Sequence, residues 1–186
     1  MAIDLELYRR EVMVAQRPRL HLSMIDVAPD AAPNDDAEAA QKTLVLVHGF
    51  GGQATQWRYQ IQHFGVAHRV IAIDLRGHGR SDKPAGAYTM DELVHDLEAA
   101  LTTVRLQQPI ILVGHSFGGA IATEYALAHP QQVAHLVLIA TAGQFRLNRL
   151  SQWVFRLPLT SLRLLQRFTR GWLHAPFHVL KPWHQN

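Results

Sequence analysis

Cysteine is absent from the 186 residues of the chain. Without thiols the protein can form no disulfide, no cysteine nucleophile and no cysteine-based metal site. Long apolar runs are missing as well, and none approaches the roughly 18 residues that span a membrane. The N-terminal residues MAIDLE have neither the basic start nor the apolar core of a secretory signal. These absences favour a cytoplasmic protein.

Acidic side chains are missing from the last part of the chain. Residues 1–143 contain 11 Lys and Arg against 15 Asp and Glu, whereas residues 144–186 contain seven Lys and Arg and no acid. The net charge of +3 therefore combines a negative body with a strongly basic tail. A nucleic-acid partner would have to bind the tail alone, and no known nucleic-acid motif accompanies its arginines. We expect no nucleic-acid partner.

Apolar segments of strand length alternate with segments of helical period. The predicted strands cover residues 11–27 (as one or two antiparallel strands), 43–47, 70–73, 110–113 and 133–140, and the predicted helices cover 55–63, 89–104 and 118–128. The helix at 89 begins with a capping box, in which Thr89 and Glu92 satisfy the first free N–H groups. Strands that alternate with helices predict an α/β fold with a mostly parallel, doubly wound sheet.

Residues 110–119 read IILVGHSFGG and contain the pattern G-x-S-x-G from Gly114 to Gly118. An apolar strand precedes the pattern and an apolar helix follows it, which is the context of a nucleophile elbow. The two glycines let strand and helix approach closely, and Ser116 projects at a helix N-terminus that favours a developing anion. The alternative is a glycine-rich turn with an incidental serine.

Two further segments follow strands upstream: HGFGG at residues 48–52 and DLRGHGRSD at residues 74–82. With the elbow, and in this order, they resemble the α/β-hydrolase family over residues 20–143. The nearest branch holds esterases, C–C hydrolases, epoxide hydrolases and cofactor-free haloperoxidases. The resemblance implies the N-terminal portion of that fold, strands one to six. It also implies a small ester-like substrate, no cofactor and no metal.

The resemblance also assigns roles to residues. Ser116 is the expected nucleophile, and the backbone N–H groups of Phe50 and Phe117 are the expected oxyanion donors. His48 organises its loop in this interpretation, although a role as the base is an alternative. The residues expected to support the motifs are His48, Gly49, Gly114, His115 and Gly118.

A catalytic acid and histidine are the parts that we expect to be missing. The triad order in this family is Ser, then Asp or Glu, then His, and the last carboxylate side chain of the sequence is Glu124. Histidines in the tail would lack the carboxylate that sets a catalytic tautomer. We therefore expect a core at residues 1–143, followed by part of a helical lid at 144–186, with the chain ending inside the lid.

The resemblance predicts a serine hydrolase that works through an acyl-enzyme on carboxylic esters, thioesters, lactones or C–C bonds. A serine nucleophile argues against epoxide hydrolase chemistry, for which the family uses Asp at this position. The chain alone should be inactive or feebly active. Two alternatives remain: a non-catalytic truncated remnant, and contact of the basic amphipathic residues 144–186 with a lipid surface.

Overall fold

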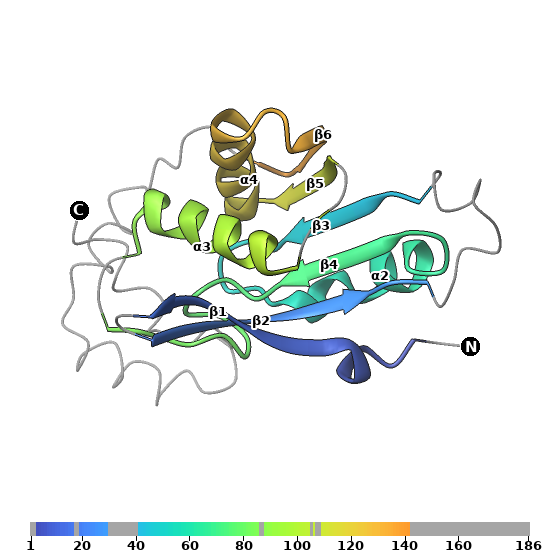
Figure 1. The fold of residues 1–186 in the computed structure, drawn as a ribbon, viewed down its shortest axis with the longest axis horizontal. Helices are drawn as coiled ribbons and strands as arrows, with labels where there is room; N and C mark the ends of the chain where they lie inside the picture. Colours follow the sequence, from blue (N-terminus) through green and yellow to red (C-terminus); the bar gives the residue numbers. More distant parts are fainter. Residues whose placement is uncertain are drawn as a thin grey trace, which may run out of the picture.

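Strands of one sheet form the centre of the computed structural model, which describes residues 3–16, 19–29, 41–85, 88–104, 106 and 109–141. The six strands are β1 (Arg9–Gln16), β2 (Arg19–Val27), β3 (Thr43–Val47), β4 (Arg69–Ile73), β5 (Ile110–His115) and β6 (Val133–Ile139). They lie in the order β1-β2-β4-β3-β5-β6 (Figure 1). β1 and β2 are antiparallel to their neighbours, and the other four strands are parallel. This confirms the predicted sheet; the expected lid at 144–186 lies outside the described residues.

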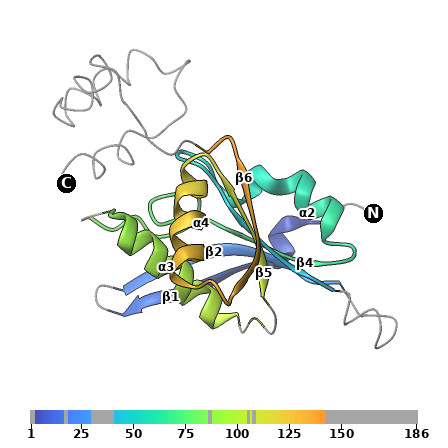
Figure 2. The same ribbon diagram turned by 90° about the horizontal axis from the view of Figure 1, so that it is seen from above.

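Helices cover both faces of the sheet. They are η1 (Leu5–Tyr8), η2 (Ala54–Trp57), α2 (Arg58–Phe64), α3 (Met90–Thr103) and α4 (Phe117–Ala128). α3 and α4 lie on one face and α2 on the other, as Figure 2 shows from above. None of these described helices is long and apolar enough to cross a membrane.

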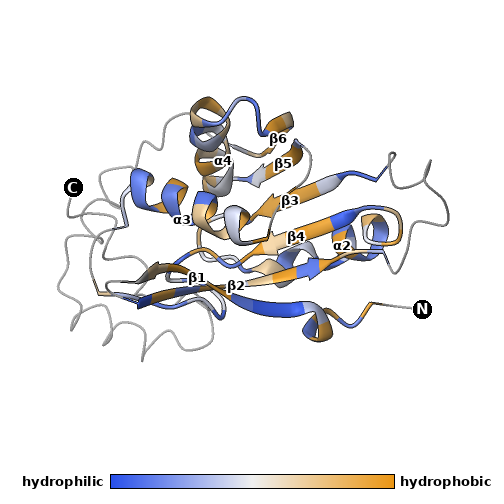
Figure 3. Ribbon diagram, viewed as in Figure 1, coloured by the Kyte–Doolittle hydropathy of each residue, from blue (hydrophilic) through white to orange (hydrophobic). Residues whose placement is uncertain are grey.

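The inner strands are buried on both sides and hence almost wholly apolar (Figure 3). In β3, Val45 and Val47 belong to the core under α3 and α4. Leu44 and Leu46 alternate with them and belong to the core under η2 and α2. Successive side chains of a strand point to opposite faces, so an unbroken apolar run is what a strand covered on both faces requires.

The predicted helix at residues 55–63 is two elements in the structure. η2 begins at Ala54 as a 3-10 helix, and α2 continues from Arg58. Ala54 and Trp57 are three residues apart and both buried, and three-residue spacing aligns side chains in a 3-10 helix. The tighter winding thus turns both toward the sheet. The Thr89 capping box of α3 is confirmed in both directions.

A change of direction in the strand order lies at β3. After β3 the chain forms β4 on one side of β3 and then returns to form β5 on the other side of β3. The connections therefore leave the carboxyl ends of β3 and β5 in opposite directions, and open α/β sheets bind ligands in the crevice at such a switch point. Val47 and Gly114 are paired there. The loop at 48–52 and the G-x-S-x-G turn follow directly.

β6 forms an edge of this sheet. Its residues Leu136 to Ile139 are apolar, yet between 37% and 47% of each is exposed. Among the described residues, β5 is the only strand that pairs with it. Its second edge consequently presents backbone N–H and C=O groups without a strand partner in the described part of the chain.

Candidate active site

Ser116 occupies the sharp turn between β5 and α4. Its φ of 51° lies in the left-handed region, which costs a non-glycine residue about 1–3 kcal/mol and persists only where the surroundings enforce it. Its N–H donates to the Ile139 carbonyl at 2.9 Å, and its carbonyl accepts from the Gly119 N–H at 3.0 Å. The sequence predicted a strained serine between a strand and a helix, and the backbone has this form.

The glycines of the motif allow the turn to pack closely against neighbouring backbone. A Cβ on Gly114 would lie 2.5 Å from the Gly119 Cα, and one on Gly118 would lie 2.5 Å from the Val47 carbonyl oxygen. Both contacts are with backbone that cannot move aside. The start of α4 therefore packs directly on the carboxyl ends of β5 and β3, which explains the glycines of the motif physically.

The loop after β3 lies beside the serine. A Cβ on Gly49 would be 3.0 Å from the Ser116 Cβ. The Gly52 N–H donates to the Gly49 carbonyl at 3.0 Å, and Gly51 has a φ of 72°. These features define a type II turn, whose third residue needs a positive φ. Phe50 is the second residue of this turn, and it is 40% exposed.

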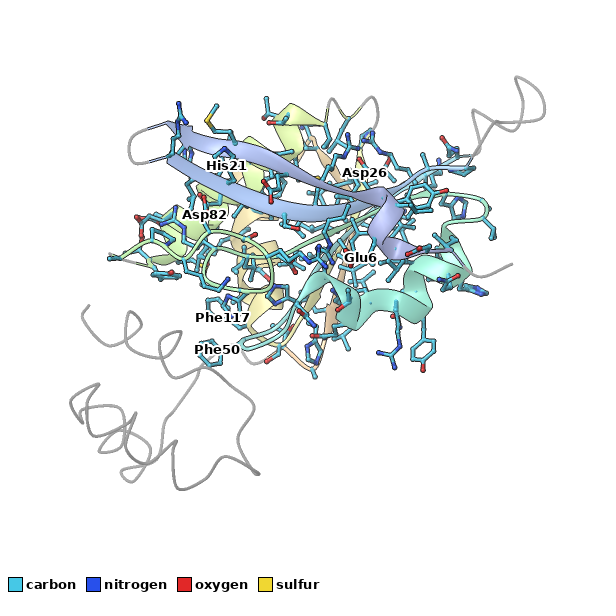
Figure 4. The ribbon with its side chains drawn as sticks, turned by 90° about the horizontal axis from the view of Figure 1, so that it is seen from below. Glu6, His21, Asp26, Phe50, Asp82 and Phe117 are labelled. Atoms are coloured by element: carbon cyan, nitrogen blue, oxygen red, sulfur yellow. The ribbon has the colours of Figure 1, made fainter. Side chains whose placement is uncertain are left out.

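The two phenylalanines proposed as backbone donors lie at the same end of the molecule (Figure 4). Phe117 is the first residue of α4 and is buried. The amino end of a helix carries a partial positive charge. An anion held at this helix end would meet that positive charge.

His48 is fully buried beneath the turn, at 0% exposure. Its Nδ1 lies 2.7 Å from the Gly49 carbonyl oxygen, and its Nε2 accepts the Leu75 N–H at 3.1 Å. A carbonyl only accepts and an N–H only donates, so the ring is neutral with its proton on Nδ1. Because the backbone engages both nitrogens, neither is left to take a proton from Ser116. The geometry favours the loop-organising role over the role of base.

Burial makes His48 a source of acid sensitivity. It lowers the pKa of the ring from 6.5 to about 4. Between pH 6.5 and 4 the ring binds a proton in the unfolded chain but not in the native protein. The contribution of neutral His48 to the free energy of unfolding is therefore fully present above pH 6.5 and is lost as the pH falls toward 4. The loss should total roughly 2–4 kcal/mol.

We expect His48→Gln to be less stable at pH 7 but to lose less stability on acidification, as measured by urea unfolding. His95→Gln, at an exposed position, is the control, and an unchanged acid slope in His48→Gln would contradict the assignment.

The carboxylate of Asp74 holds several loops together. Asp74 accepts the Ala54 N–H at 2.5 Å and the Arg80 N–H at 3.0 Å, and it pairs with Arg9 at 3.2 Å. It thereby joins the start of η2 to the 76–80 turn and to β1. Asp74 therefore acts as a scaffold for the loops around the site.

A buried ion pair was missed in the sequence. Arg76 donates to both carboxylate oxygens of Asp96, at 2.6 and 2.8 Å, and pairs with Glu92 at 3.1 Å. These pairs raise the pKa of Arg76 against the effect of its burial. They fasten the 74–82 loop to α3. The sequence does contain a sign of this pair. Asp96 is an acidic residue on the apolar helix face that Leu93 and Leu97 begin.

His115 extends from the turn toward η2. Its Nδ1 lies 3.2 Å from the Gln56 amide nitrogen, and its ring meets Trp57 edge-on at 6.4 Å. The predicted residues Gly49, Phe50, His115, Ser116 and Phe117 are thus brought to one end of the sheet. No group of three or more metal-binding side chains occurs among the described residues.

Comparisons with known proteins agree with this geometry. A family model described as alpha/beta hydrolase fold matches residues 42–175. The acetyltransferase component of the Pseudomonas putida acetoin cleaving system is 44% identical over 100 residues, covering 54% of this chain and 27% of the relative. Epoxide hydrolase 4 of Mus musculus is 36% identical over 104 residues, covering 55% and 29%. A carboxylesterase structure from Nitrososphaera gargenis matches with a TM-score of 0.65 and 27% identity, over 87% of this chain and 54% of that one. The matched region spans less than a third of each curated relative.

Proposed function

Because the chain belongs to the α/β-hydrolase family, we propose that it is a serine hydrolase of ester-like substrates. The observation that carries the proposal is Ser116, held at a φ of 51° at the amino end of α4. Strain of this kind clusters at active sites, where it aims a side chain. The substrates that we propose are small carboxylic esters, thioesters, lactones or activated C–C bonds.

The proposed reaction begins with attack of the Ser116 hydroxyl oxygen on the substrate carbonyl carbon. The carbonyl π electrons move to the oxygen, and the N–H groups of Phe50 and Phe117 stabilise this oxyanion. The hydroxyl proton of Ser116 passes to a base during the attack. Collapse of the tetrahedral intermediate then breaks the bond to the leaving group, which takes up this proton from the base. An acyl-serine remains, and water hydrolyses it to the acid and free Ser116.

The proposal places the base and its carboxylate outside this chain. The acid follows the nucleophile in this family, and no carboxylate follows Glu124 in the sequence. Glu124 itself is exposed on α4. The residues at 144–186, outside the described part, are proposed as part of a lid. Lipid contact of this segment and a non-catalytic remnant remain the alternatives.

A second candidate function is acyl transfer. The Pseudomonas putida relative is named an acetyltransferase component, and an acyl-serine can pass its acyl group to an acceptor other than water. Serine at position 116 favours ester hydrolysis and acyl transfer over epoxide hydrolysis, the reaction that the name of the Mus musculus relative gives. Product analysis with and without an added thiol or alcohol would separate hydrolysis from transfer.

The amino-acid sequence also bears on the cofactors and partners that we propose. The chain carries no nucleotide-binding or metal-ligand motif, so the proposed reaction uses no cofactor and no metal. A small acyl substrate in the cytoplasm is the proposed partner, and nucleic acid is not.

Hydrolysis of a p-nitrophenyl ester by the 186-residue chain tests the function. Loss of the acid and the histidine leaves residual catalysis of about 10³–10⁴-fold over water at best, supplied by the serine and the oxyanion donors that the chain keeps. We expect a slow rate that requires Ser116. Turnover at the roughly 1–10³ per second of ordinary enzymes would reveal a base within the chain, and a rate equal to buffer would favour the remnant.

A further inference from the structure

We propose that His78 is a positioning residue for the reaction, because it holds the turn that carries the oxyanion donor Phe50. The inference rests on the proposed function. His78 belongs to the loop after β4, whereas Phe50 belongs to the loop after β3. Its side chain links these two loops.

Hydrogen bonds define this link. The Gly51 N–H donates to the Nε2 of His78 at 3.1 Å, and the Nδ1 of His78 donates to the Arg76 carbonyl at 3.0 Å. The ring of Phe50 stands edge-on to the His78 ring, with centroids 5.8 Å apart and planes at 80°. The imidazole is buried, so water does not replace it easily as the acceptor for Gly51.

The bond to Gly51 selects one form of the turn. The peptide group between Phe50 and Gly51 can face two ways, since type I and type II turns differ chiefly in this peptide. Glycine tolerates either sign of φ and would permit the flip. At its φ of 72°, Gly51 directs its N–H to His78. A flip would break the bond and reverse a dipole next to the Phe50 N–H.

Neutral imidazole is required for this role, because Nε2 must accept. Burial is the main cause that lowers the pKa of His78, and Lys83 lowers it further. Asp74 and the Arg76 carbonyl oppose this effect. His48 faces the same ring at 5.1 Å and is itself neutral, since burial lowers its pKa as well. The facing groups other than Asp74 and the Arg76 carbonyl therefore allow or favour the neutral form.

Two substitutions separate positioning from local folding. In His78→Asn, the amide nitrogen takes the place of Nδ1 and can still donate to the Arg76 carbonyl, but nothing reaches Gly51. In His78→Gln, the longer amide presents an acceptor near the place of Nε2. If His78 acts through Gly51, Gln preserves its function and Asn does not. If it only folds its own loop, Asn is the better replacement.

The measurement is Ser116-dependent hydrolysis of a p-nitrophenyl ester by the whole chain, with melting temperatures recorded in parallel. We expect His78→Asn to lower kcat about 10–100-fold with KM little changed, because a misplaced group acts mainly on the transition state. We expect His78→Gln to retain kcat within a few-fold. Equal kcat values for the two variants, or a better Asn variant, would overturn the inference while the hydrolase function stands. No Ser116-dependent rate in the unaltered chain would instead favour the non-catalytic remnant over the hydrolase, and the inference would fall with the proposed function.

The unaltered chain provides a second test that needs no variant to fold. As the pH falls below 6.5, the reference value from which the His78 pKa is lowered, protonation should shift the Gly51 amide resonance in ¹H–¹⁵N spectra. The Ser116-dependent kcat should fall with the same midpoint. A Gly51 shift with no accompanying loss of kcat would overturn the positioning role.

Discussion

Replacing Ser116 with alanine should abolish labelling of the protein by a fluorophosphonate probe and reduce ester hydrolysis to the background rate. The probe reacts with an activated serine hydroxyl, and the variant has none. A serine in an intact triad is worth about 10⁶-fold in kcat, so this is the largest functional effect that we expect in a form of the protein that holds the acid and the histidine. Fluorescence of the labelled band on a gel measures it, and mass spectrometry of the labelled peptide locates the adduct. Both measurements are made on a form of the protein that also holds the acid and the histidine, where the serine is activated.

Alanine is a clean replacement here. It keeps the Cβ and hence the strained φ, so the melting temperature of Ser116→Ala should remain close to that of the unaltered chain. Ser81→Ala is the matched control, because Ser81 is buried and its hydroxyl binds the Asp74 carbonyl and the Ser23 N–H. That control should lose stability but keep its labelling at low temperature. Full labelling of Ser116→Ala would reject Ser116 as the nucleophile.

Gly118→Ala should destabilise the fold by about 3 kcal/mol or more, a large effect for one methyl group. Alanine is normally the better helix residue by about 1 kcal/mol, so helix propensity alone predicts the opposite sign. At this position the new Cβ would lie 2.5 Å from the Val47 carbonyl oxygen and 2.8 Å from its carbon. Both atoms belong to a central strand, so α4 itself would have to move.

Urea unfolding of both forms measures this difference. Leu127→Ala, in the same helix at a position that is 72% exposed, is the control and should change stability by no more than about 0.5 kcal/mol. Stability of Gly118→Ala equal to or above that of the unaltered chain would show that α4 can withdraw from β3. The close packing described for the turn would then not be required.

The strands were the most predictable part of the fold. Residues 43–47 were predicted as a strand and form β3 with the same ends, because a run buried on both faces is apolar without interruption and stops at polar or glycine residues. The division of residues 54–64 into η2 and α2 was not predicted. It depends on the hydrogen bond from Ala54 to Asp74 and on the burial of Trp57, which are contacts with the sheet.

The turn of the candidate site was predictable because its cause is local. Glycines on both sides of Ser116 permit one backbone form, and the structure contains it. Contacts between loops were not predictable. His78 lies within the segment at 74–82 in the sequence, yet its Nε2 binds Gly51 in the loop after β3. No role was predicted for Asp96, yet it pairs with Arg76. Such partners become neighbours only when β3, β4 and α3 have assembled.

The bond from the Ser116 N–H to the Ile139 carbonyl makes the serine depend on a strand that is synthesised after it. A ribosome releases the chain from its amino end, so β1 to β5 can begin to pair while β6 is still inside the exit tunnel. During that interval nothing from β6 holds the serine backbone in its costly form, and strain without support relaxes. Arrival of β6 therefore completes the nucleophile turn as well as the edge of the sheet. A nascent chain would gain a correctly aimed serine only after residue 139 has emerged.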